Sequence, residues 1–145
     1  MLIGQYHTKV SPKGRMAFPK RFREVLGDNL VVTVGYENSL MVVSAKDWKA
    51  LIESTENKPF ILNSARDTNR FLLGEATEID LDEQGRCILP SYLRQYAQID
   101  QEAVFLGLNK YVEIWDKGLW EKYQKILNEN IGKIAEKLSE SDKQG

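Results

Sequence analysis

Apolar and polar residues alternate in short runs along most of the chain, and two pairs of these runs are separated only by turn-forming residues. The first pair covers residues 30–34 and 40–43, and the second covers residues 103–106 and 111–115. All four runs are rich in β-branched, aromatic or other apolar residues, and a glycine and an asparagine lie between the two members of each pair. This composition is typical of strands joined by a turn. The pattern therefore predicts two β-hairpins.

Three other segments space their apolar residues every three or four positions, as helices do. One begins at Ser44, which has the spacing of a capping box with the carboxylate three residues later. The second covers residues 63–73 and ends before a glycine, and the third and clearest covers residues 119–138. After it the chain becomes polar, and we expect the last helix to fray over residues 139–145.

An internal repeat organises these elements. Residues 13–23 align with residues 84–94 at an offset of 71, and both copies read x-Gly-Arg-x-x-apolar-Pro-x-x-aromatic/apolar-Arg. We expect each copy to form a short strand, a tight turn at Gly-Arg where glycine permits a positive φ, a second short strand, and a helix that begins after the proline. The expected strands are residues 5–10 and 15–18 in the first copy, and residues 77–81 and 86–89 in the second.

The repeat predicts an α+β fold with four parts. The first repeat occupies residues 5–48, a helical linker occupies residues 49–75, the second repeat occupies residues 76–119, and a C-terminal helix and tail occupy residues 120–145. A hairpin of this size does not bury both of its faces alone. Two repeats around a pseudo-twofold axis would share one small, barrel-like core.

The charge is distributed unevenly, although the 145 residues carry a formal net charge of only −1. Residues 1–24 hold six basic side chains and one acidic side chain, a net charge of +5. Residues 75–98 hold two basic and five acidic side chains, a net charge of −3. Because salt screens each charge beyond roughly 8–10 Å, a local basic patch can bind phosphate whatever the total charge. The first Gly-Arg turn lies in such a patch.

Other classes of chemistry have little support. The chain has one histidine, His7, and one cysteine, Cys87, so it lacks the ligands of a Cys/His zinc site and can form no internal disulfide. The two glycine-rich motifs that bind nucleotide phosphates, Gly-x4-Gly-Lys-Ser/Thr and Gly-x-Gly-x-x-Gly, do not occur. No signal peptide and no membrane-spanning run is recognisable. We expect no cofactor, no metal, no small-molecule substrate, no membrane association and no enzymatic activity.

Several motifs together resemble the MraZ family of bacterial transcriptional regulators, whose double module belongs to the AbrB-like swapped-hairpin superfamily. The likeness covers nearly the whole chain: residues 3–6, residues 13–15 with Pro19, residues 65–71, residues 74–76, and residues 82–86 with Pro90. The family usually has acidic residues just before the first Lys-Gly-Arg, whereas this chain has Ser11 and Pro12, which make that turn more basic and stiffer.

The resemblance implies two AbrB-like swapped-hairpin modules that form a small barrel. It also implies a cytoplasmic, nucleoid-associated regulator of the division and cell-wall gene cluster, often acting on its own promoter. The partners would be double-stranded DNA, at direct repeats that contain a run of guanines, and further copies of the chain in a ring-shaped homo-oligomer.

The candidate DNA-binding residues lie on and after the two turns. A guanidinium on a tight turn can donate two parallel hydrogen bonds to guanine, so Arg15 and Arg86 are the candidate base readers. Gly14 would let the backbone approach the duplex. The other basic candidates are Lys13, for phosphate or base, and the phosphate contacts Lys20, Arg21 and Arg23.

Alternatives remain at this stage. Arg15 could be an exposed turn residue without a partner, and Arg86 could form a salt bridge with Asp82 or Glu83. The protein could also be an antitoxin that binds a second protein, or a ring-forming scaffold. An antitoxin is expected to carry a disordered tail rather than an amphipathic C-terminal helix, and a scaffold would not need arginine on both turns.

Overall fold

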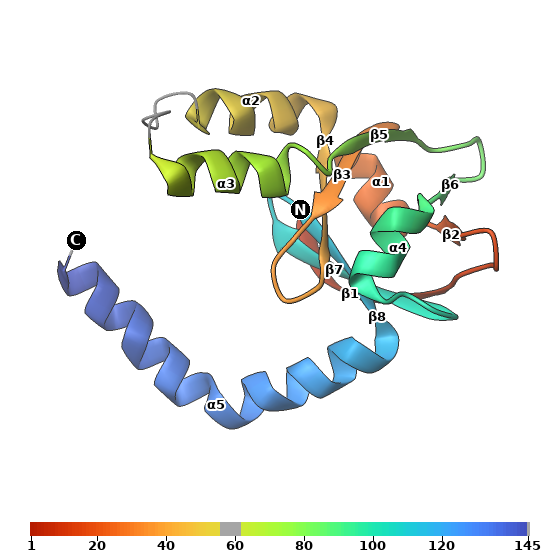
Figure 1. Cartoon of the computed structure of the whole chain (residues 1–145). Helices are drawn as coiled ribbons and strands as arrows, with labels where there is room; N and C mark the ends of the chain where they lie inside the picture. Colours follow the sequence, from red (N-terminus) through yellow and green to blue (C-terminus); the bar gives the residue numbers. More distant parts are fainter. Residues whose placement is uncertain (56–61, 145) are drawn as a thin grey trace.

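The structure, a computed structural model, describes residues 1–55 and 62–144 (Figure 1). The strands in these residues are β1 (Leu2–Lys9), β2 (Arg15–Ala17), β3 (Asn29–Val34), β4 (Leu40–Ser44), β5 (Thr77–Asp80), β6 (Arg86–Ile88), β7 (Glu102–Asn109) and β8 (Val112–Asp116). The helices are α1 (Lys20–Leu26), α2 (Ala45–Thr55), α3 (Asn63–Leu72), α4 (Ser91–Ala97) and α5 (Lys117–Gln144). The fold is therefore α+β, and both predicted hairpins, β3–β4 and β7–β8, are present.

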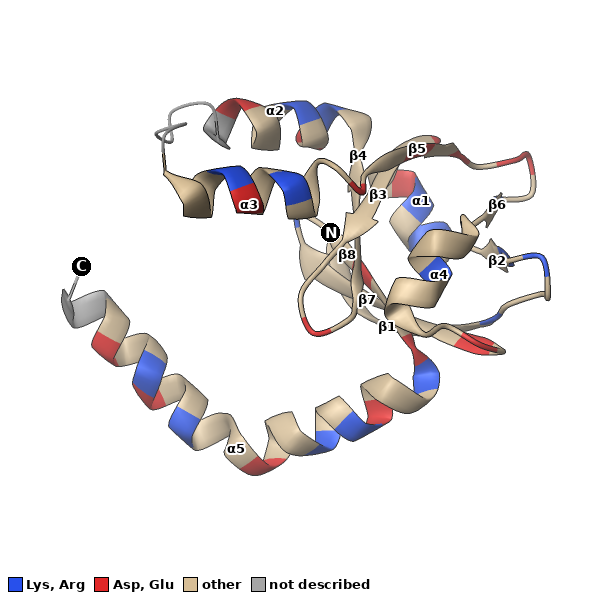
Figure 2. Ribbon diagram, viewed as in Figure 1, with Lys and Arg blue, Asp and Glu red and all other residues tan. Residues whose placement is uncertain are grey.

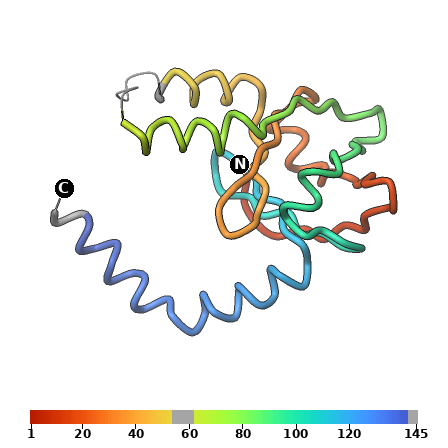
Figure 3. The backbone as a smooth tube through the Cα atoms, viewed as in Figure 1, coloured from red at the N-terminus to blue at the C-terminus, as the bar shows by residue number. Residues whose placement is uncertain are grey.

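The strands of the two repeats pair across the repeats. The main sheet is antiparallel with the order β1-β7-β8-β4-β3-β5, so the first strand of each repeat pairs with the third strand of the other. The two hairpins meet where β4 pairs with β8. A second, two-stranded sheet joins β2 to β6. Neither repeat contains a complete sheet, and the two halves of the chain are intertwined (Figure 3).

One expectation about the sheet is wrong. The main sheet does not close into a barrel in the part of the chain that the structure describes, since β1 and β5 stand at the two ends of the strand order. The short strands β2 and β6 pair with each other in a separate two-stranded sheet and do not join these two edges.

The main core lies between the large sheet, the small sheet, α1 and α4. Phe22 and Leu26 of α1 are buried, and Leu93 and Ala97 are buried at the equivalent positions of α4. Full burial of each large side chain contributes about 1.5–3 kcal/mol. Gly27 follows the end of α1, with its N–H donating to the carbonyl oxygen of Arg23 at 2.9 Å. The repeat thus fills one core with matching residues from both halves.

The helices between the repeats are also close to prediction. Ser44 caps α2, since its Oγ accepts a hydrogen bond from the N–H of Asp47 at 3.1 Å. Helix α3 ends at Leu72, one residue short of the predicted end. It lies beside α2 in Figure 1, and its last carbonyl accepts a hydrogen bond from the Thr33 hydroxyl on β3.

Helix α5 is longer than predicted and is only partly packed. Its first turns pack on β7 and β8, with the Trp115 ring 5.2 Å from that of Trp120 and 5.1 Å from that of Tyr123. Its second half extends away from the sheets (Figure 1), and Ile131 is 61% exposed. The predicted fraying after residue 138 is wrong, because the helix continues to Gln144. Polar residues such as glutamate and lysine are good helix formers, and residues 139–144 contain no glycine or proline.

Candidate nucleic-acid interface

Both Gly-Arg turns lie at the same end of the molecule, beyond the small sheet (Figures 1 and 3). We call residues 11–15 the first turn and residues 82–86 the second turn. The first turn joins β1 to β2, and the second joins β5 to β6. Because β2 and β6 pair with each other, the sheet brings together two turns that are far apart in the sequence.

The pairing of β2 with β6 also fixes the direction of the two arginines. Arg15 and Arg86 each lie opposite the residue two positions beyond the other arginine. Residues opposite each other, and residues two apart on one strand, point to the same side of a sheet. Arg15 and Arg86 therefore share the outer side, whereas Met16 and Cys87, opposite each other between them, are buried.

Backbone hydrogen bonds close the first turn. The N–H of Gly14 donates to the carbonyl oxygen of Ser11 at 2.9 Å, and the N–H of Ser11 donates to the carbonyl oxygen of Arg15 at 3.0 Å. The Ser11 hydroxyl oxygen also accepts a hydrogen bond from the N–H of Arg15 at 3.0 Å. Gly14 has a φ of 88°, a conformation that favours glycine.

The second turn has the same geometry with an acidic residue in the place of the serine. The N–H of Gly85 donates to the carbonyl oxygen of Asp82 at 2.9 Å, and Gly85 has a φ of 76°. The Asp82 carboxylate accepts a hydrogen bond from the N–H of Arg86 at 2.8 Å, as the Ser11 hydroxyl does in the first turn. The serine and proline in the first turn therefore leave its backbone geometry like that of the second.

The two turns differ in charge. The Nε of Arg86 lies 3.3 Å from Oδ2 of Asp82, so the intramolecular salt bridge considered for Arg86 is present. The backbone N–H of Arg86, with further help from its charge, lowers the pKa of Asp82 below its usual value. Lys13 and Arg15 are exposed, and no ion pair involves either of them within residues 1–55 and 62–144. Figure 2 shows basic residues on the first turn and acidic residues along the second.

The basic residues of α1 are divided between solvent and core. Lys20 and Arg21 are exposed, and Arg21 donates a hydrogen bond from Nη1 to the Tyr6 hydroxyl at 3.4 Å. This hydrogen bond raises the pKa of Arg21 above its ordinary value. Arg23 is half-buried, and its guanidinium lies against Gly85 of the second turn. Of the predicted phosphate contacts, two are accessible and the third faces the opposite repeat.

Arg94 occupies the position of Arg23 in the second repeat, and sequence reasoning did not single it out. Its Nε donates to the carbonyl oxygen of Leu89 at 3.0 Å, and its Nη1 lies 3.5 Å from the carbonyl oxygen of Pro12 in the first turn. The internal repeat could have indicated Arg94, because the aligned segments 13–23 and 84–94 both end in arginine.

The other residues that could carry chemistry, Cys87 and His7, form no catalytic or metal site within the described residues. Burial raises the pKa of the Cys87 thiol to about 12, so it behaves as a small apolar side chain. His7 lies exposed on β1. Within the described residues, no group of three His, Cys, Asp or Glu side chains is placed to hold a metal ion. No helix in the same residues is long and apolar enough to cross a membrane.

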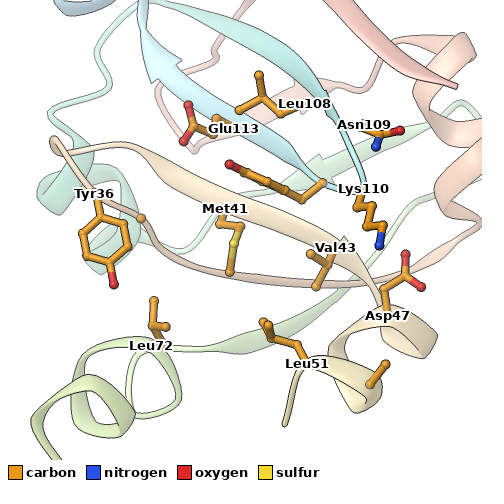
Figure 4. A pocket seen from close by; sticks show the side chains of 13 residues that line it. Tyr36, Met41, Val43, Asp47, Leu51, Leu72, Leu108, Asn109, Lys110 and Glu113 are labelled. Carbon is orange, nitrogen blue, oxygen red and sulfur yellow. The ribbon is translucent and has the colours of Figure 1, made fainter. Parts of the chain in front are cut away.

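A cavity of about 750 Å³ lies away from the turns, near the tips of the two hairpins (Figure 4). Its walls are mostly apolar and come from β4, α2, α3 and the two hairpin tips; they include Tyr36, Met41, Val43, Leu51, Leu72, Leu108 and Tyr111. Glu113 also lines it, and burial raises the pKa of this carboxyl while a hydrogen bond from Trp115 Nε1 at 3.0 Å opposes that rise. Asn109 lines the cavity and pairs with Leu2 at the start of β1, whereas the first turn follows the end of β1 at Lys9. The cavity and the first turn therefore lie at opposite ends of β1.

The sequence of the chain matches one family of known proteins. The family model described as "MraZ protein, putative antitoxin-like" matches residues 1–71 and again residues 72–141. The transcriptional regulator MraZ of Caldanaerobacter subterraneus subsp. tengcongensis is 41% identical over 138 residues, which are 95% of this chain and 96% of that protein. The transcriptional regulator MraZ of Moorella thermoacetica is 39% identical over 142 residues, 98% of this chain and 99% of that protein.

One solved structure, the solution structure of PHS018 from Pyrococcus horikoshii, aligns with 79% of this chain and 88% of its own. The TM-score is 0.32 and the identity is 16%, so the likeness carries no argument about fold or function.

Proposed function

This chain belongs to the MraZ family, and on that premise we propose that it is a DNA-binding transcriptional regulator that reads double-stranded DNA with its two Gly-Arg turns. The observation that carries the proposal is the placement of Arg15 and Arg86 on the same outer side of the β2–β6 sheet. Its relatives are named as transcriptional regulators, and regulators of this family are not enzymes.

Arg15 is the principal base reader in this proposal. A guanidinium can donate two parallel hydrogen bonds to O6 and N7 of guanine in the major groove, and each such contact contributes roughly 1–3 kcal/mol of discrimination. In Arg86, Nε is already paired with Asp82, so the ion pair restrains the side chain and leaves only its Nη groups for the same contact. Lys13, Lys20 and Arg21 are exposed and would bind phosphate, which sets the position of the protein on the duplex without reading sequence.

The resemblance to the family supports the finer part of the proposal. We infer that the protein acts in the cytoplasm on nucleoid DNA, at the promoter of the division and cell-wall gene cluster, often its own. The swapped-hairpin description of the modules is supported by the pairing of β1 with β7 and of β3 with β5, which joins each repeat to the other.

We also propose that several copies form a ring. The described residues hold two separate apolar surfaces: the cavity near the hairpin tips, and the exposed isoleucines and leucine on α5 after residue 125. Because the two surfaces are different patches, a contact between them is head-to-tail, and such contacts close into rings when the rotation allows. A ring would present several first turns to several DNA boxes at once, which raises affinity without new chemistry.

The antitoxin alternative is supported by the words "putative antitoxin-like" in the description of the family, but not by the geometry of the described residues. The C-terminal segment is helical to Gln144, whereas the alternative expects a tail that folds only on a toxin. A scaffold without DNA binding leaves the two outward arginines without a purpose.

The test is a mobility shift with the DNA directly upstream of the protein's own gene. Arg15→Ala should weaken binding by at least about tenfold, as expected for the loss of a bidentate guanine contact. Arg86→Ala should weaken it less, because Asp82 already holds Arg86. Lys122→Ala, which removes an exposed cation from α5, is the matched control and should bind like the unchanged protein. Equal binding by Arg15→Ala and the unchanged protein would contradict the proposal.

A further inference from the structure

Each Gly-Arg turn rests on an arginine from the other half of the chain. A Cβ at Gly14 would lie 2.5 Å from Nε of Arg94 and 2.7 Å from the carbonyl oxygen of Leu89, so a side chain at this position would overlap the guanidinium. Gly85 lies on Arg23 in the same way, since a Cβ there would overlap the Arg23 guanidinium. Arg23 and Arg94 are equivalent positions of the repeat, and the two contacts are therefore reciprocal.

Hydrogen bonds extend the contact at the first turn. The guanidinium of Arg94 donates from Nε to the carbonyl oxygen of Leu89, and its Nη1 lies 3.5 Å from the carbonyl oxygen of Pro12. The carbonyl oxygen of Gly14 accepts a hydrogen bond from the N–H of Leu89 at 2.9 Å. Arg94 thus links two carbonyl groups, one in the first turn and one in the second repeat, and the glycine between them leaves room for the planar group.

The second turn has the same packing with fewer hydrogen bonds. The carbonyl oxygen of Gly85 accepts a hydrogen bond from the N–H of Phe18 at 2.9 Å. The Nε of Arg23 is buried and has no hydrogen-bond partner in the described part of the chain. A buried donor without a partner costs stability, so the position of this arginine is not explained by its own hydrogen bonding. The contact with Gly85 gives it a role.

We propose that Arg94 and Arg23 are positioning residues, each of which holds the Gly-Arg turn of the opposite repeat in the conformation that presents its arginine to DNA. Arg94 acts on Arg15 through Gly14, and Arg23 acts on Arg86 through Gly85. The inference rests on the proposed function of the two turns. A base-reading side chain gains affinity when its backbone is held in the bound conformation before binding, and here that support crosses from one half of the chain to the other.

The alternative role for these arginines is direct contact with phosphate, as the sequence predicts for Arg23. The substitution of lysine separates the two roles. Lysine keeps the positive charge and can still bind phosphate, but it lacks the planar group with five fixed donors that lies under the glycine. Arg94→Lys should therefore weaken binding to the operator by about tenfold while leaving binding to unrelated DNA unchanged.

A crossed double-mutant cycle tests which turn each arginine supports. Arg94→Lys should add no further loss to Arg15→Ala, since both act on the first turn, and should add its full loss to Arg86→Ala. Arg23→Lys should show the opposite pattern. Additive losses in all four combinations, or coupling within the same repeat, would overturn the proposal.

Amide hydrogen exchange in the full-length protein without DNA gives an independent readout. Arg94→Lys should accelerate exchange of the Gly14 and Arg15 amides about tenfold or more relative to the second turn, and Arg23→Lys should do the same for the Gly85 and Arg86 amides. Equal acceleration in both turns, or none, would overturn the inference. If no variant or unchanged protein binds the operator, the proposed function fails while this measurement still decides the positioning role.

A glycine pair keeps the test decisive if the arginine variants fold poorly. Gly14→Ala adds a methyl group on the Arg94 guanidinium at a φ of 88°, whereas Gly27→Ala adds one at a φ of 80° where no atom of the described residues lies within 4 Å. Both variants carry the backbone strain, but only Gly14→Ala overlaps neighbouring atoms, which are the Arg94 guanidinium and the carbonyl oxygen of Leu89. Faster exchange in the first turn is expected for Gly14→Ala alone, and the same exchange pattern in both variants would contradict the role of Arg94.

Discussion

The Nε of Arg86 lies 3.3 Å from Oδ2 of Asp82, whereas the described residues form no such ion pair at the first turn, because Ser11 occupies the position of the aspartate. The turns share their backbone hydrogen bonds, so this one residue accounts for much of their difference in charge. Ser11 leaves the Arg15 side chain free to approach DNA, whereas Asp82 holds the Arg86 side chain on the protein.

Exchanging these two residues should move DNA affinity in opposite directions. Asp82→Ser frees Arg86 and removes a negative charge, so we expect about two- to fivefold tighter binding to the operator, as the loss of an exposed ion pair allows. Ser11→Asp should weaken binding by a similar factor because it offers Arg15 a competing partner. Fluorescence anisotropy at fixed salt measures both.

Asp80→Ser is the control for this exchange, because Asp80 is exposed on β5 and is not among the ion-pair partners of Arg86. It should tighten binding less than Asp82→Ser.

The pKa of Asp82 is lowered, so its charged form is stabilised in the folded protein, and that contribution is lost only as the pH falls through the lowered value. The difference between Asp82→Ser and the unchanged protein should therefore be the same at about pH 6 and about pH 8.

The two halves of α5 should respond differently to substitution. Trp120→Ala removes a buried side chain that also donates a hydrogen bond from Nε1 to Gln5 at 3.2 Å, and should cost about 3–5 kcal/mol of unfolding free energy. Ile131→Ser with Ile134→Ser should change that free energy little in a single chain but should dissociate the assembly. Denaturant unfolding and sedimentation velocity measure the two effects.

Lys133→Ser, which lies between these isoleucines, is the control and should leave the assembly intact. An assembly that survives the double isoleucine substitution would show that this surface of α5 is not an interface.

Cys87 should resist alkylation in the folded protein. Its pKa of about 12 leaves almost no thiolate near neutral pH, and the thiolate is the reactive form. Mass spectrometry after treatment with iodoacetamide at about pH 8 should show no adduct until denaturant is added, since an unperturbed thiol has a pKa near 8.5. Rapid labelling of the native protein would contradict the burial of Cys87 on the inner side of the β2–β6 sheet.

The hairpins, the caps and the tight turns could be predicted because each depends on residues that are close together in the sequence. Ser44 caps α2 through an amide three residues away, and Gly27 ends α1 through a carbonyl four residues away. The outward direction of Arg15 follows from the alternation of exposed and buried residues on β2. The structure agrees with the sequence at these points.

The pairing between repeats could not be predicted from the pattern. Each repeat has similar strands, so the hydrophobic pattern alone does not decide whether β2 pairs with a strand of its own repeat or with β6. The packing of Gly14 and Gly85 against arginines could not be predicted for the same reason. A positive φ explains a glycine locally, but the arginine packed against each one comes from the other repeat.

The spacing of DNA boxes should matter if several turns bind at once. A single arginine contributes roughly 1–3 kcal/mol, less than the roughly 4–10 kcal/mol that separates specific from non-specific binding. Adjacent boxes should therefore lie about 10–10.5 base pairs apart, so that each turn meets the same face of the duplex.

An insertion of about five base pairs between boxes should weaken binding steeply, and an insertion of about ten should restore it. Equal affinity for the five-pair insertion and the natural spacing would leave one turn reading one box.

The most direct test of the central claim, that Arg15 reads guanine, replaces each guanine of the operator in turn by 7-deazaguanine, which lacks the N7 acceptor. The unchanged protein should lose about three- to tenfold in affinity at one guanine per box, as expected for one of two parallel hydrogen bonds. Arg15→Ala, measured at low salt where residual binding is detectable, should be insensitive to the same replacement. If the loss at that guanine persists in Arg15→Ala, or if no replacement weakens the unchanged protein, Arg15 is not the residue that reads the base.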